Sequence, residues 1–595
     1  MSLVKWFYSF LVFLLLFFSF RMPVLASAEF DTSYQGTYTI TSDGKTLVDL
    51  QIIIKNNLPD IYISQYSVTV GATNLANILA WDSFGPLTPE VTKTTNRTQI
   101  SVNFTNKAVG KNKTNLLKLR YETPDFSAVN GSVLEVTIPG MSKMAELIDY
   151  QVDLIVPQSF GPVSFIQPKP DTQYQENANE IYHFSKGRLS KFEGVTAAFG
   201  DSQVFDFSLN YQLKNPNKFP GQTEIVLPAD TGYQQVSYSS IAPRPIAVRE
   251  DQDSNWLATY YLDSDQELNV IASGSVQIFI KEQSQPKNPA MDQELLEQYL
   301  KKDLYWEVDD PLIKTEAKKL GNIENIYRFV SDTLIYDYGR LSGPSKRLGA
   351  LNAITNPESS LCMEFTDLFI ALARAQGIPA REVDGFAYTP NPKLRPLSLS
   401  SDVLHAWPEY YDSAKNVWIP VDPTWENTTG GIDFFHKLDL NHFAFVRHGI
   451  KSNYPAPPGA YSLSTTKKNI NVWFGKKELK LAKADLQIIT SSEQMAGLLI
   501  SGKVVIKNSG QIAIYNQTAT IRAEGFEKTF DLTVLPPYAS FSEDFSFSSQ
   551  WNQTKKYTLE LVYNNQAVDF EVQTQSFYIY LIKSLQKWFR ILLKR

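Results

Sequence analysis

The chain has 595 residues, a length that predicts several domains rather than a single core. With 43% hydrophobic and 20% charged residues, its composition is that of a globular protein and excludes a chain that is disordered in bulk. The formal net charge of −6 is mild and argues against nucleic-acid binding by the chain as a whole.

The first 28 residues have the pattern of a secretion signal. Lys5 precedes an uninterrupted apolar run over residues 6–20, and Ala26-Ser27-Ala28 is a small-x-small cleavage site. The run is shorter than the roughly 20 residues that a spanning helix needs. We therefore predict a cleaved signal peptide at 1–28 and a location outside the cytoplasm or at the cell surface. An uncleaved N-terminal anchor is the alternative.

Residues 29–285 predict β structure throughout. Short segments such as SVLEVTIPG and YQVDLIVPQ alternate or run apolar, and Asn, Gly and Pro turns separate them. Spacing of this kind is typical of β-sandwiches. A break near residue 200 predicts an N-terminal β-sandwich domain at 29–200 and a second β domain at 201–285.

The pattern changes to helical periodicity after a Pro-containing linker near residue 286. Residues 310–339 predict two helices separated near Gly321, and a later helix begins with Ser359 or Ser360 as its N-cap. Three segments with strand character follow. Helices followed by a sheet predict an α+β domain at 290–460.

The chain's single cysteine, Cys362, falls in the first turn of that later helix. A thiolate is the nucleophilic form of cysteine, but a thiol with a pKa of about 8.5 is mostly protonated at neutral pH. The helix N-terminus favours an anion by about 0.3–1 kcal/mol, which is not enough. A histidine beside the sulfur and a carboxylate that holds this histidine are also needed. Without them Cys362 is a small buried hydrophobic residue.

His405 and Asp422 are the candidates for these two roles. His405 follows Cys362 by 43 residues on a predicted strand, and Asp422 lies 17 residues further, on the next predicted strand. A turn over residues 412–416 joins the two strands. Antiparallel neighbours joined in this way can place both side chains on one face of the sheet.

These segments resemble the transglutaminase-like superfamily, whose papain-like fold includes transglutaminases, peptide N-glycanases and bacterial proteases. The similar blocks are CMEFTDLFIALARAQGIPAREVDGF, HAW and VDPTW, in this order, and the resemblance covers about residues 290–450. It implies that Cys362 is the nucleophile, His405 the general base and acid, and Asp422 the group that orients the imidazole. Ser360 stands where the family often has glycine, and its side chain can narrow access or alter the turn.

The family chemistry implies thiolate attack on a carboxamide or peptide carbonyl, protonation of the leaving amine by His405, and a thioester intermediate. The backbone N–H of Cys362 is one expected oxyanion donor. Water then gives hydrolysis and an amine gives a cross-link. Because water greatly exceeds amines, a site without a dry amine tunnel favours hydrolysis. We expect an extracytoplasmic protein or peptide substrate and no metal or other cofactor.

Three neighbouring residues have two possible roles each. Trp407 and Trp425 either shield the histidine–carboxylate pair or wall the substrate, or they pack in the core. Glu364 would oppose thiolate formation if it faced the sulfur. In the first turn of a helix, an interaction with the helix dipole is favoured.

His436, His442 and His448 recur every six residues. This spacing suits no common metal pair, so we expect surface positions or local hydrogen bonds for them. The sequence contains no evident P-loop, zinc motif or dinucleotide loop.

The remainder of the chain returns to β structure and then ends in a basic helix. Residues 465–575 form predicted hairpins with Asn-rich turns, typical of an immunoglobulin-like sandwich. Residues 576–595 contain five basic residues and no acidic one, and their apolar side chains fall on one side of a helix. We predict an amphipathic helix at a membrane surface, with packing on its own domain as the alternative.

The predicted architecture is multidomain and mostly β. β-Sandwich modules flank an α+β transglutaminase-like domain, and a C-terminal immunoglobulin-like sandwich and an amphipathic helix follow. The predicted function is that of an exported cysteine enzyme acting on protein or peptide amides. The alternative is a catalytically inactive surface protein that binds or scaffolds.

Overall fold

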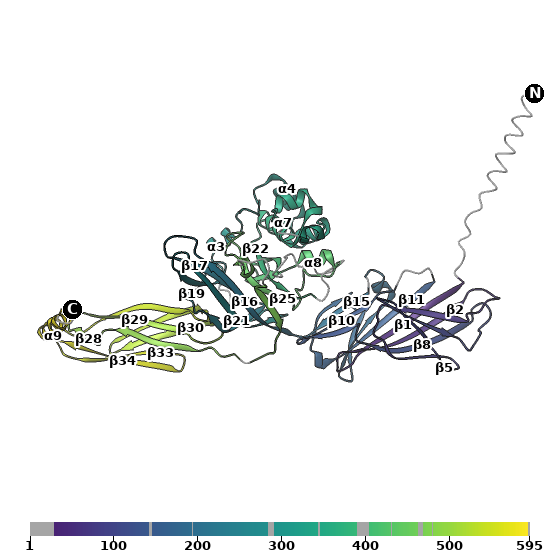
Figure 1. The fold of residues 1–595 in the computed structure, drawn as a ribbon, viewed down its shortest axis with the longest axis horizontal. Coiled ribbons are helices and arrows are strands. Elements are labelled where there is room, and N and C mark those ends of the chain that lie inside the picture. Colours follow the sequence, from purple (N-terminus) through teal and green to yellow (C-terminus); the bar gives the residue numbers. More distant parts are fainter. Residues whose placement is uncertain are drawn as a thin grey trace, which may run out of the picture. The chain divides into compact units, whose positions relative to one another are not determined.

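The structure of the chain is a computed structural model (Figure 1). It describes residues 29–592 except 142–145, 193, 284–290, 343–345, 390–403, 430, 462–467, 479 and 552. The predicted signal peptide at 1–28 thus lies outside the described residues. The chain divides into two compact units, one ending at Val129 together with Leu134–Phe199, the other Asn130–Val133 together with the residues from Gly200 onward.

The first unit is built from β-strands whose side chains alternate between buried and exposed positions. This alternation arises because successive residues of a strand point to opposite faces and one face packs on the core. The elements are β1 Phe30–Ile40, β2 Thr46–Asn56, β3 Gln65–Val70, β4 Ala76–Asp82, β5 Gly85–Leu87, β6 Glu90–Lys93, β7 Thr98–Asn103, β8 Thr114–Thr123, β9 Ser127–Asn130, β10 Val133–Pro139, β11 Leu147–Pro157, β12 Val163–Gln167, β13 Thr172–Glu176, β14 Asn179–Phe184 and β15 Gly194–Phe199, with η1 Gln158–Phe160 and α2 Lys186–Leu189.

Three sheets make up this unit. The largest has the order β13-β14-β11-β1-β2-β8-β4-β5, and the smaller two are β12-β15-β10-β9 and β3-β7-β6. β1 pairs with β2 in antiparallel fashion and with β11 in parallel fashion. Apolar side chains from all three sheets form one buried core.

The second unit begins with a β module of two sheets, β18-β21-β16-β26 and β17-β20-β19. The strand bounds are β16 Ser202–Lys214, β17 Gly221–Leu227, β18 Gln234–Ala242, β19 Ala247–Glu250, β20 Trp256–Leu262, β21 Glu267–Phe279 and β26 Ile470–Phe474.

The edge strand β26 comes from far along the sequence. It pairs with β16 in antiparallel register from Leu209↔Ile470 to Phe205↔Phe474, and the two phenylalanine rings stack with centroids 5.2 Å apart. This pairing corrects the predicted start of the C-terminal sandwich at 465. Residues 470–474 complete the second β module, and the C-terminal sandwich starts at Ala484.

Between β21 and β26 lies a central α+β domain with one four-stranded sheet, β24-β23-β22-β25. In Figure 1 the helices α4 and α7 lie together above this sheet. The bounds are α3 Gln293–Gln298, α4 Pro311–Leu320, α5 Ile323–Thr333, η2 Tyr338–Ser342, α6 Ala350–Thr355, η3 Pro357–Ser359, α7 Cys362–Ala375, β22 Ala380–Ala387, β23 His405–Asp412, β24 Val417–Pro420, α8 Pro423–Thr428, β25 His442–His448 and η4 Pro458–Tyr461.

The helix α7 is the centre of this domain's core. Nearly all of its residues are buried, and they pack against α4, α5 and α6 and against Tyr410 and Ile419 of the sheet. The two helices predicted around Gly321 are α4 and α5, and Gly321 has a left-handed φ of 78° that ends α4. The predicted N-cap of α7 is corrected: Leu361 occupies this position, because Pro357 begins a 3-10 turn that includes Ser359.

The central sheet is joined to the β module along β25. The Arg447 guanidinium donates to the carbonyl oxygens of Asp230 and Ser254, and the Asn255 side chain bonds the Arg447 backbone in both directions. Gln234 accepts the Ala444 N–H and donates to the Ala444 carbonyl. Buried polar groups on two elements thus fix the position of β25.

The C-terminal region is a pair of sheets, β27-β29-β32 and β28-β34-β33-β30-β31, followed by one helix. The bounds are β27 Ala484–Thr490, β28 Glu493–Met495, β29 Leu499–Asn508, β30 Ile514–Ala523, β31 Phe526–Leu535, β32 Ser540–Ser548, β33 Lys556–Tyr563, β34 Gln566–Gln575 and α9 Phe577–Leu592. Within the described ranges, no helix combines the length and the apolarity that crossing a bilayer requires. The described chain is multidomain and mostly β, as predicted.

Candidate active site

Cys362 is the first residue of α7 and is fully buried. The turn before it is held by Glu364, whose carboxylate accepts the N–H groups of Leu361 and Leu348, both at 2.8 Å. Arg340 pairs with the same carboxylate at 3.0 Å. Glu364 therefore caps the helix that carries the cysteine, in line with the role expected from its place in the first turn.

Asp422 does not lie on a strand, which corrects the sequence prediction. β24 ends at Pro420, and Asp422 is the N-cap of α8, where its Oδ1 accepts the Trp425 N–H at 3.0 Å. The cause is local: an aspartate followed by proline is a favoured helix start, because the aspartate accepts a free N–H and proline needs none.

The side chains of His405 and Asp422 meet even so. His405 is the first residue of β23, and its Nε2 lies 2.8 Å from Asp422 Oδ2. Both side chains are fully buried. An ionised carboxylate can only accept, so Nε2 carries the hydrogen and the imidazole is held in one orientation.

The imidazole of His405 also contacts Cys362. Its second nitrogen, Nδ1, is buried and has no N or O hydrogen-bond partner among the described residues. A side-chain hydrogen bond and the charge of Cys362 are among the causes that raise the pKa of His405. Because Nε2 is engaged with Asp422, we infer that Nδ1 faces the thiol. The three predicted residues are thus brought together.

Electrostatics favour a charged imidazole next to a charged carboxylate. Burial alone would lower the pKa of His405, but the charge and hydrogen bond of Asp422, followed by Cys362, raise it to about 9. Burial alone would raise the pKa of Asp422, but His405 and His442 outweigh it and hold this pKa well below its usual value. The pair is therefore ionised at neutral pH.

Two tryptophan rings enclose the His405 imidazole. Trp425 stacks on it with centroids 5.0 Å apart and Trp407 with centroids 6.0 Å apart. Both tryptophans are buried, and Trp425 also packs with Phe434. Both rings therefore cover the imidazole and also belong to the core, while a part in shielding the pair from water or in walling the substrate stays a prediction.

His442 is the residue of this site that the sequence reasoning missed. The local hydrogen bond expected for it is present, to Asp439, but the ring is not at the surface: it is buried, and its Nε2 lies 3.3 Å from Asp422 Oδ2. Its Nδ1 lies 2.7 Å from Asp439 Oδ1. His436 has the same Asp-x-x-His pattern with Asp433 but is exposed, so this pattern alone does not single out His442.

Two buried hydroxyl groups lie close to the nucleophile. Tyr336 forms a parallel β-bridge with Ser360, two residues before Cys362, and its ring contacts Phe365 of α7. Neither the Tyr336 hydroxyl nor the Ser360 hydroxyl has a hydrogen-bond partner in the part of the chain that the structure describes. Burial, and next the charge of Cys362, raise the pKa of Tyr336 far above its ordinary value. Tyr336 is therefore a neutral donor near the thiol.

Two groups of side chains have the chemistry of metal ligands. His405, Asp422 and His442 offer ligand atoms within 4.8 Å of one another, as do Glu382, Asp384 and His448. Hydrogen bonds already join the atoms of the first group. In the second group Arg347 lies 2.9 Å from Glu382 and opposes a cation. The expectation of no metal stays a prediction.

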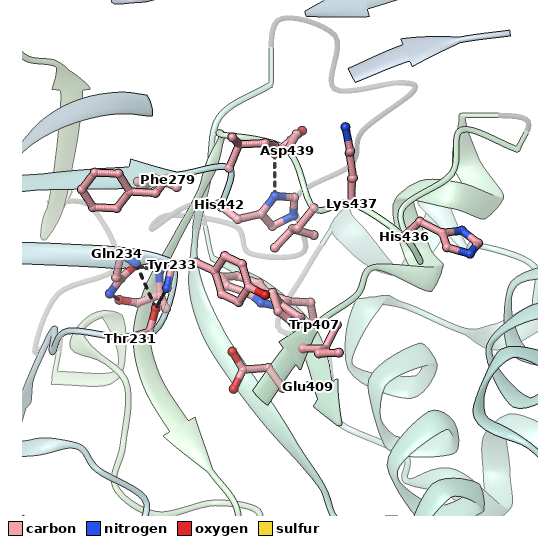
Figure 2. Close-up of a pocket in the computed structure, with 16 residues that line it drawn as sticks. Thr231, Tyr233, Gln234, Phe279, Trp407, Glu409, His436, Lys437, Asp439 and His442 are labelled. Atoms are coloured by element: carbon pink, nitrogen blue, oxygen red, sulfur yellow. Dashed lines mark hydrogen bonds and ion pairs between the residues drawn. The ribbon is translucent and has the colours of Figure 1, made fainter. Parts of the chain in front are cut away.

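A pocket with a volume of about 110 Å³ lies beside the ring cluster of His405, Trp407, Trp425 and His442, and two of these residues, Trp407 and His442, line it (Figure 2). The central domain contributes Trp407, Glu409 and His442 to its wall, and the β module contributes Tyr233 and Phe279. Cys362 and His405 do not line it. The pocket therefore lies between the β module and the rings of Trp407 and His442, and the Cys362 thiol is not part of its wall.

The sequence of residues 307–423 matches the family model described as the transglutaminase-like superfamily. No protein of curated function matches the chain. Among solved structures, a candidate cysteine protease from Cytophaga hutchinsonii is similar at 14% identity over 63% of this chain and 99% of its own, with a TM-score of 0.30. A CARDB domain from Pyrococcus furiosus is 17% identical over 16% of this chain and 98% of its own, with a TM-score of 0.15. An M1 zinc metallopeptidase from Deinococcus radiodurans is 11% identical over 30% of this chain and 43% of its own, with a TM-score of 0.20.

Proposed function

Since the chain contains a transglutaminase-like domain, a fold of cysteine enzymes, we propose that it is a cysteine acyl-transfer enzyme whose reacting groups are Cys362, His405 and Asp422. One observation carries this proposal: a buried imidazole holds a carboxylate with one nitrogen and contacts the chain's single thiol. Nucleophile, base and orienting group are the three parts that activated cysteines need.

The reaction begins from the ion pair in which Nδ1 of His405 holds the proton of the Cys362 thiol. The resulting thiolate attacks the carbonyl carbon of an amide, a C–S bond forms, and the carbonyl π electrons move onto the oxygen. The oxyanion then collapses, the C–N bond breaks, and Nδ1–H protonates the leaving amine. A thioester on Cys362 remains. Asp422 keeps the imidazole oriented and stabilises its positive charge in both proton transfers.

The oxyanion needs donors close to the sulfur. The backbone N–H of Cys362 is one candidate, because the first N–H groups of a helix have no partner within the helix. We propose the Tyr336 hydroxyl as the second. Its burial, the absence of a hydrogen-bond partner for its hydroxyl among the described residues, and its bridge to Ser360 support this role. The Tyr336 side chain is buried, and a buried hydroxyl without a partner lowers the stability of the fold. A role in the reaction gives a reason for this cost.

Hydrolysis is the proposed fate of the thioester. Water greatly exceeds amines outside the cell, and it becomes the acyl acceptor unless a site is built to exclude it. His405 removes a proton from the water, a C–O bond forms, and the C–S bond breaks to release the acid and the thiol. We propose protein or peptide amides of the extracytoplasmic space as substrates, with cross-linking as the other outcome.

A binding or scaffolding protein is the second candidate function. The observation that favours it is the complete burial of Cys362, because a substrate carbonyl must reach the sulfur. An enzyme therefore has to open this site, whereas a scaffold has no such need. Thiol reactivity separates the two functions.

Export and attachment to a membrane surface complete the proposal. In α9, Phe577, Tyr578 and Ile582 are each more than half exposed, and Lys583 forms an ion pair with Glu493 of β28 at 2.9 Å. An exposed apolar face beside basic residues fits the interface of an anionic bilayer. Cosedimentation with anionic and neutral vesicles, comparing the full chain with one ending at residue 575, tests this attachment.

The central experiment traps the acyl-enzyme. The full chain is incubated with a peptide library, quenched in acid and analysed by mass spectrometry, in parallel with Cys362→Ala and His405→Ala. We expect an acyl adduct on the Cys362 peptide of the wild type and none in either variant. A wild-type protein that forms no adduct and whose thiol resists small alkylating reagents at every pH contradicts the enzyme and supports the scaffold.

Adding a fluorescent primary amine to the same reaction distinguishes the two fates of the thioester. Release of free acid at an unchanged rate supports hydrolysis. Quantitative incorporation of the amine supports cross-linking.

A further inference from the structure

We propose that His442 is a positioning residue of this site, which holds Asp422 through a second imidazole hydrogen bond and so sets how readily Cys362 ionises. This inference rests on the proposed function. It adds to it a fourth side chain, from the strand β25, that the family-derived set of three residues does not include.

Each nitrogen of the His442 ring faces a carboxylate oxygen. Nδ1 lies 2.7 Å from Asp439 Oδ1, and Nε2 lies 3.3 Å from Asp422 Oδ2. An ionised carboxylate accepts hydrogen bonds and does not donate them, so both nitrogens have to carry a hydrogen. The ring is therefore an imidazolium that bridges two aspartates.

The same oxygen of Asp422 accepts from both imidazoles. His405 Nε2 lies 2.8 Å from Oδ2, while Oδ1 caps α8 at Trp425. With three donors the carboxylate has little freedom to rotate. Loss of the His442 hydrogen bond would leave Oδ2 with His405 alone and would allow Asp422 to turn away from the orientation that His405 needs.

His442 also compensates charge. The reactive form of the site contains a thiolate, the His405 imidazolium and the carboxylate of Asp422, all buried, and the partly buried carboxylate of Asp439. Without a second cation, the surplus negative charge of this group would oppose formation of the thiolate. The imidazolium of His442 offsets it within contact distance.

Few other charges face His442. From β23 it meets His405 and, across the pocket, Glu409, which is paired with Arg381. From the start of α8 it meets Asp422. The segment before β25 contributes Asp439 and, at the pocket wall, His436 and Lys437. Trp407 and Trp425 cover the remaining faces of the ring with centroids 5.0 and 4.6 Å away.

The scaffold gives the ring a fixed place. His442 is the first residue of β25, the strand that buried hydrogen bonds of Gln234 and Asn255 tie to the neighbouring β module. The same strand contains a second buried histidine, His448, which serves as an example of a purely structural role. His448 is equally buried, with Nε2 2.7 Å from the Pro455 carbonyl and Nδ1 3.4 Å from Glu382, but it makes no contact with Asp422.

This parallel provides the control for an experiment on the full chain. The rate of Cys362 alkylation by iodoacetamide is measured from pH 5 to 10 for the wild type, His442→Leu, His442→Gln and His448→Gln. His442→Leu removes the donor to Asp422, and His442→Gln retains one. His448→Gln perturbs a buried histidine of the same strand without touching the site. Thermal unfolding of each variant verifies that it is folded.

We expect alkylation of the wild type to persist at pH 6. In His442→Leu the rate at pH 6 should fall about 10- to 100-fold, the size of one hydrogen bond to a charged group, and recover above pH 9. His442→Gln should recover most of the reactivity, and His448→Gln should match the wild type. A structural role predicts instead that His442→Leu and His448→Gln change the rate equally at every pH.

Two results would overturn the inference, and they differ. If the wild-type thiol is activated but His442→Leu keeps its pH profile, His442 does not position Asp422, and the proposed function stands. If the wild-type thiol ionises like a free cysteine, the proposed function fails and takes this inference with it. Should His442→Leu not fold, the folded His442→Gln and Asp439→Asn variants decide, because Asp439→Asn lowers reactivity at pH 6 only if the imidazolium matters.

Discussion

The central domain contains two buried charged clusters that share the helix α7, and their difference shows what distinguishes a reactive site from a structural one. One cluster surrounds Cys362 at the start of the helix. The other surrounds Asp367, which accepts Arg347 Nε at 2.9 Å and Trp306 Nε1 at 3.0 Å. Arg347 also donates to Glu382 at 2.9 Å.

Both clusters contain a histidine with a raised pKa, and its cause is the same. Burial alone would lower the pKa of His448, but the hydrogen bond and charge of Glu382 raise it to about 9, the value also found for His405. A shifted pKa therefore does not identify the reactive site. The difference is that His405 contacts a thiol, whereas the second cluster pairs its acids with a guanidinium that does not titrate.

The largest effect expected from substitutions in the two clusters is the loss of catalysis. Cys362→Ala and His405→Ala should each lower kcat/KM for a cleavable peptide by about 10⁴-fold or more, since members of a catalytic group act as a unit. His448→Gln, the matched change in the other cluster, should leave kcat/KM per folded molecule within a few-fold. Equal losses in all three variants would mean that the two clusters do not differ in function.

The second cluster should matter for stability instead. Arg347→Met leaves the buried carboxylates of Asp367 and Glu382 without their cation and should lower the free energy of unfolding by about 3–5 kcal/mol. Arg328→Met, which breaks an exposed i,i+4 pair with Glu324 on α5, should cost less than about 1 kcal/mol. Urea unfolding measures both. A small effect of Arg347→Met would show that this network is not structural.

A change next to the thiol should separate chemistry from binding. Tyr336→Phe removes one hydroxyl with little change in volume and should lower kcat by about 10²–10³-fold if this group stabilises the oxyanion. KM should stay within a few-fold of the wild type. Tyr338→Phe, a change in a half-exposed ring next to Tyr336, is the control. A larger change in KM than in kcat would argue for a role in binding.

A pH dependence of stability is expected from both clusters together. The pKa of His405, His442 and His448 is about 9 in the folded chain and about 6.5 in an unfolded one, so folding favours the protonated rings. Their stabilisation is complete below pH 6.5 and is lost as the pH rises through 9. The free energy of unfolding should therefore fall across this window. The fall should be smaller in His448→Gln, and an identical slope in the two proteins would contradict the assignment.

Sequence patterns could predict the elements whose signals are local. The helix of Cys362, the strand that starts at His405 and the two helices around Gly321 follow from apolar periodicity and from turn residues. The segment VWIPVDPTW is rich in β-branched and aromatic residues, which favour a strand at Asp422. The Asp-Pro pair inside it starts a helix and outweighs this preference.

Long-range packing decides what the sequence could not predict. The pairing of β26 with β16 joins residues more than 260 positions apart, and no local pattern near residue 470 indicates its partner. His442 and His436 share the same spacing from an aspartate, and only the burial of β25 distinguishes them. That the Tyr336 hydroxyl has no hydrogen-bond partner in the described part of the chain likewise becomes visible only once its surroundings are in place.

The return of the chain to β16 at β26 makes the central domain an insertion within a β module. The polypeptide enters this sheet at Ser202 and leaves it at Phe474, and Phe205 is paired with Phe474. A force that pulls on the two ends of the chain would thus act on the pairing of β16 with β26. The hydrogen bonds between these two strands would have to break before the force reached the inserted central domain. The fold thus keeps the candidate active site out of the path of mechanical force.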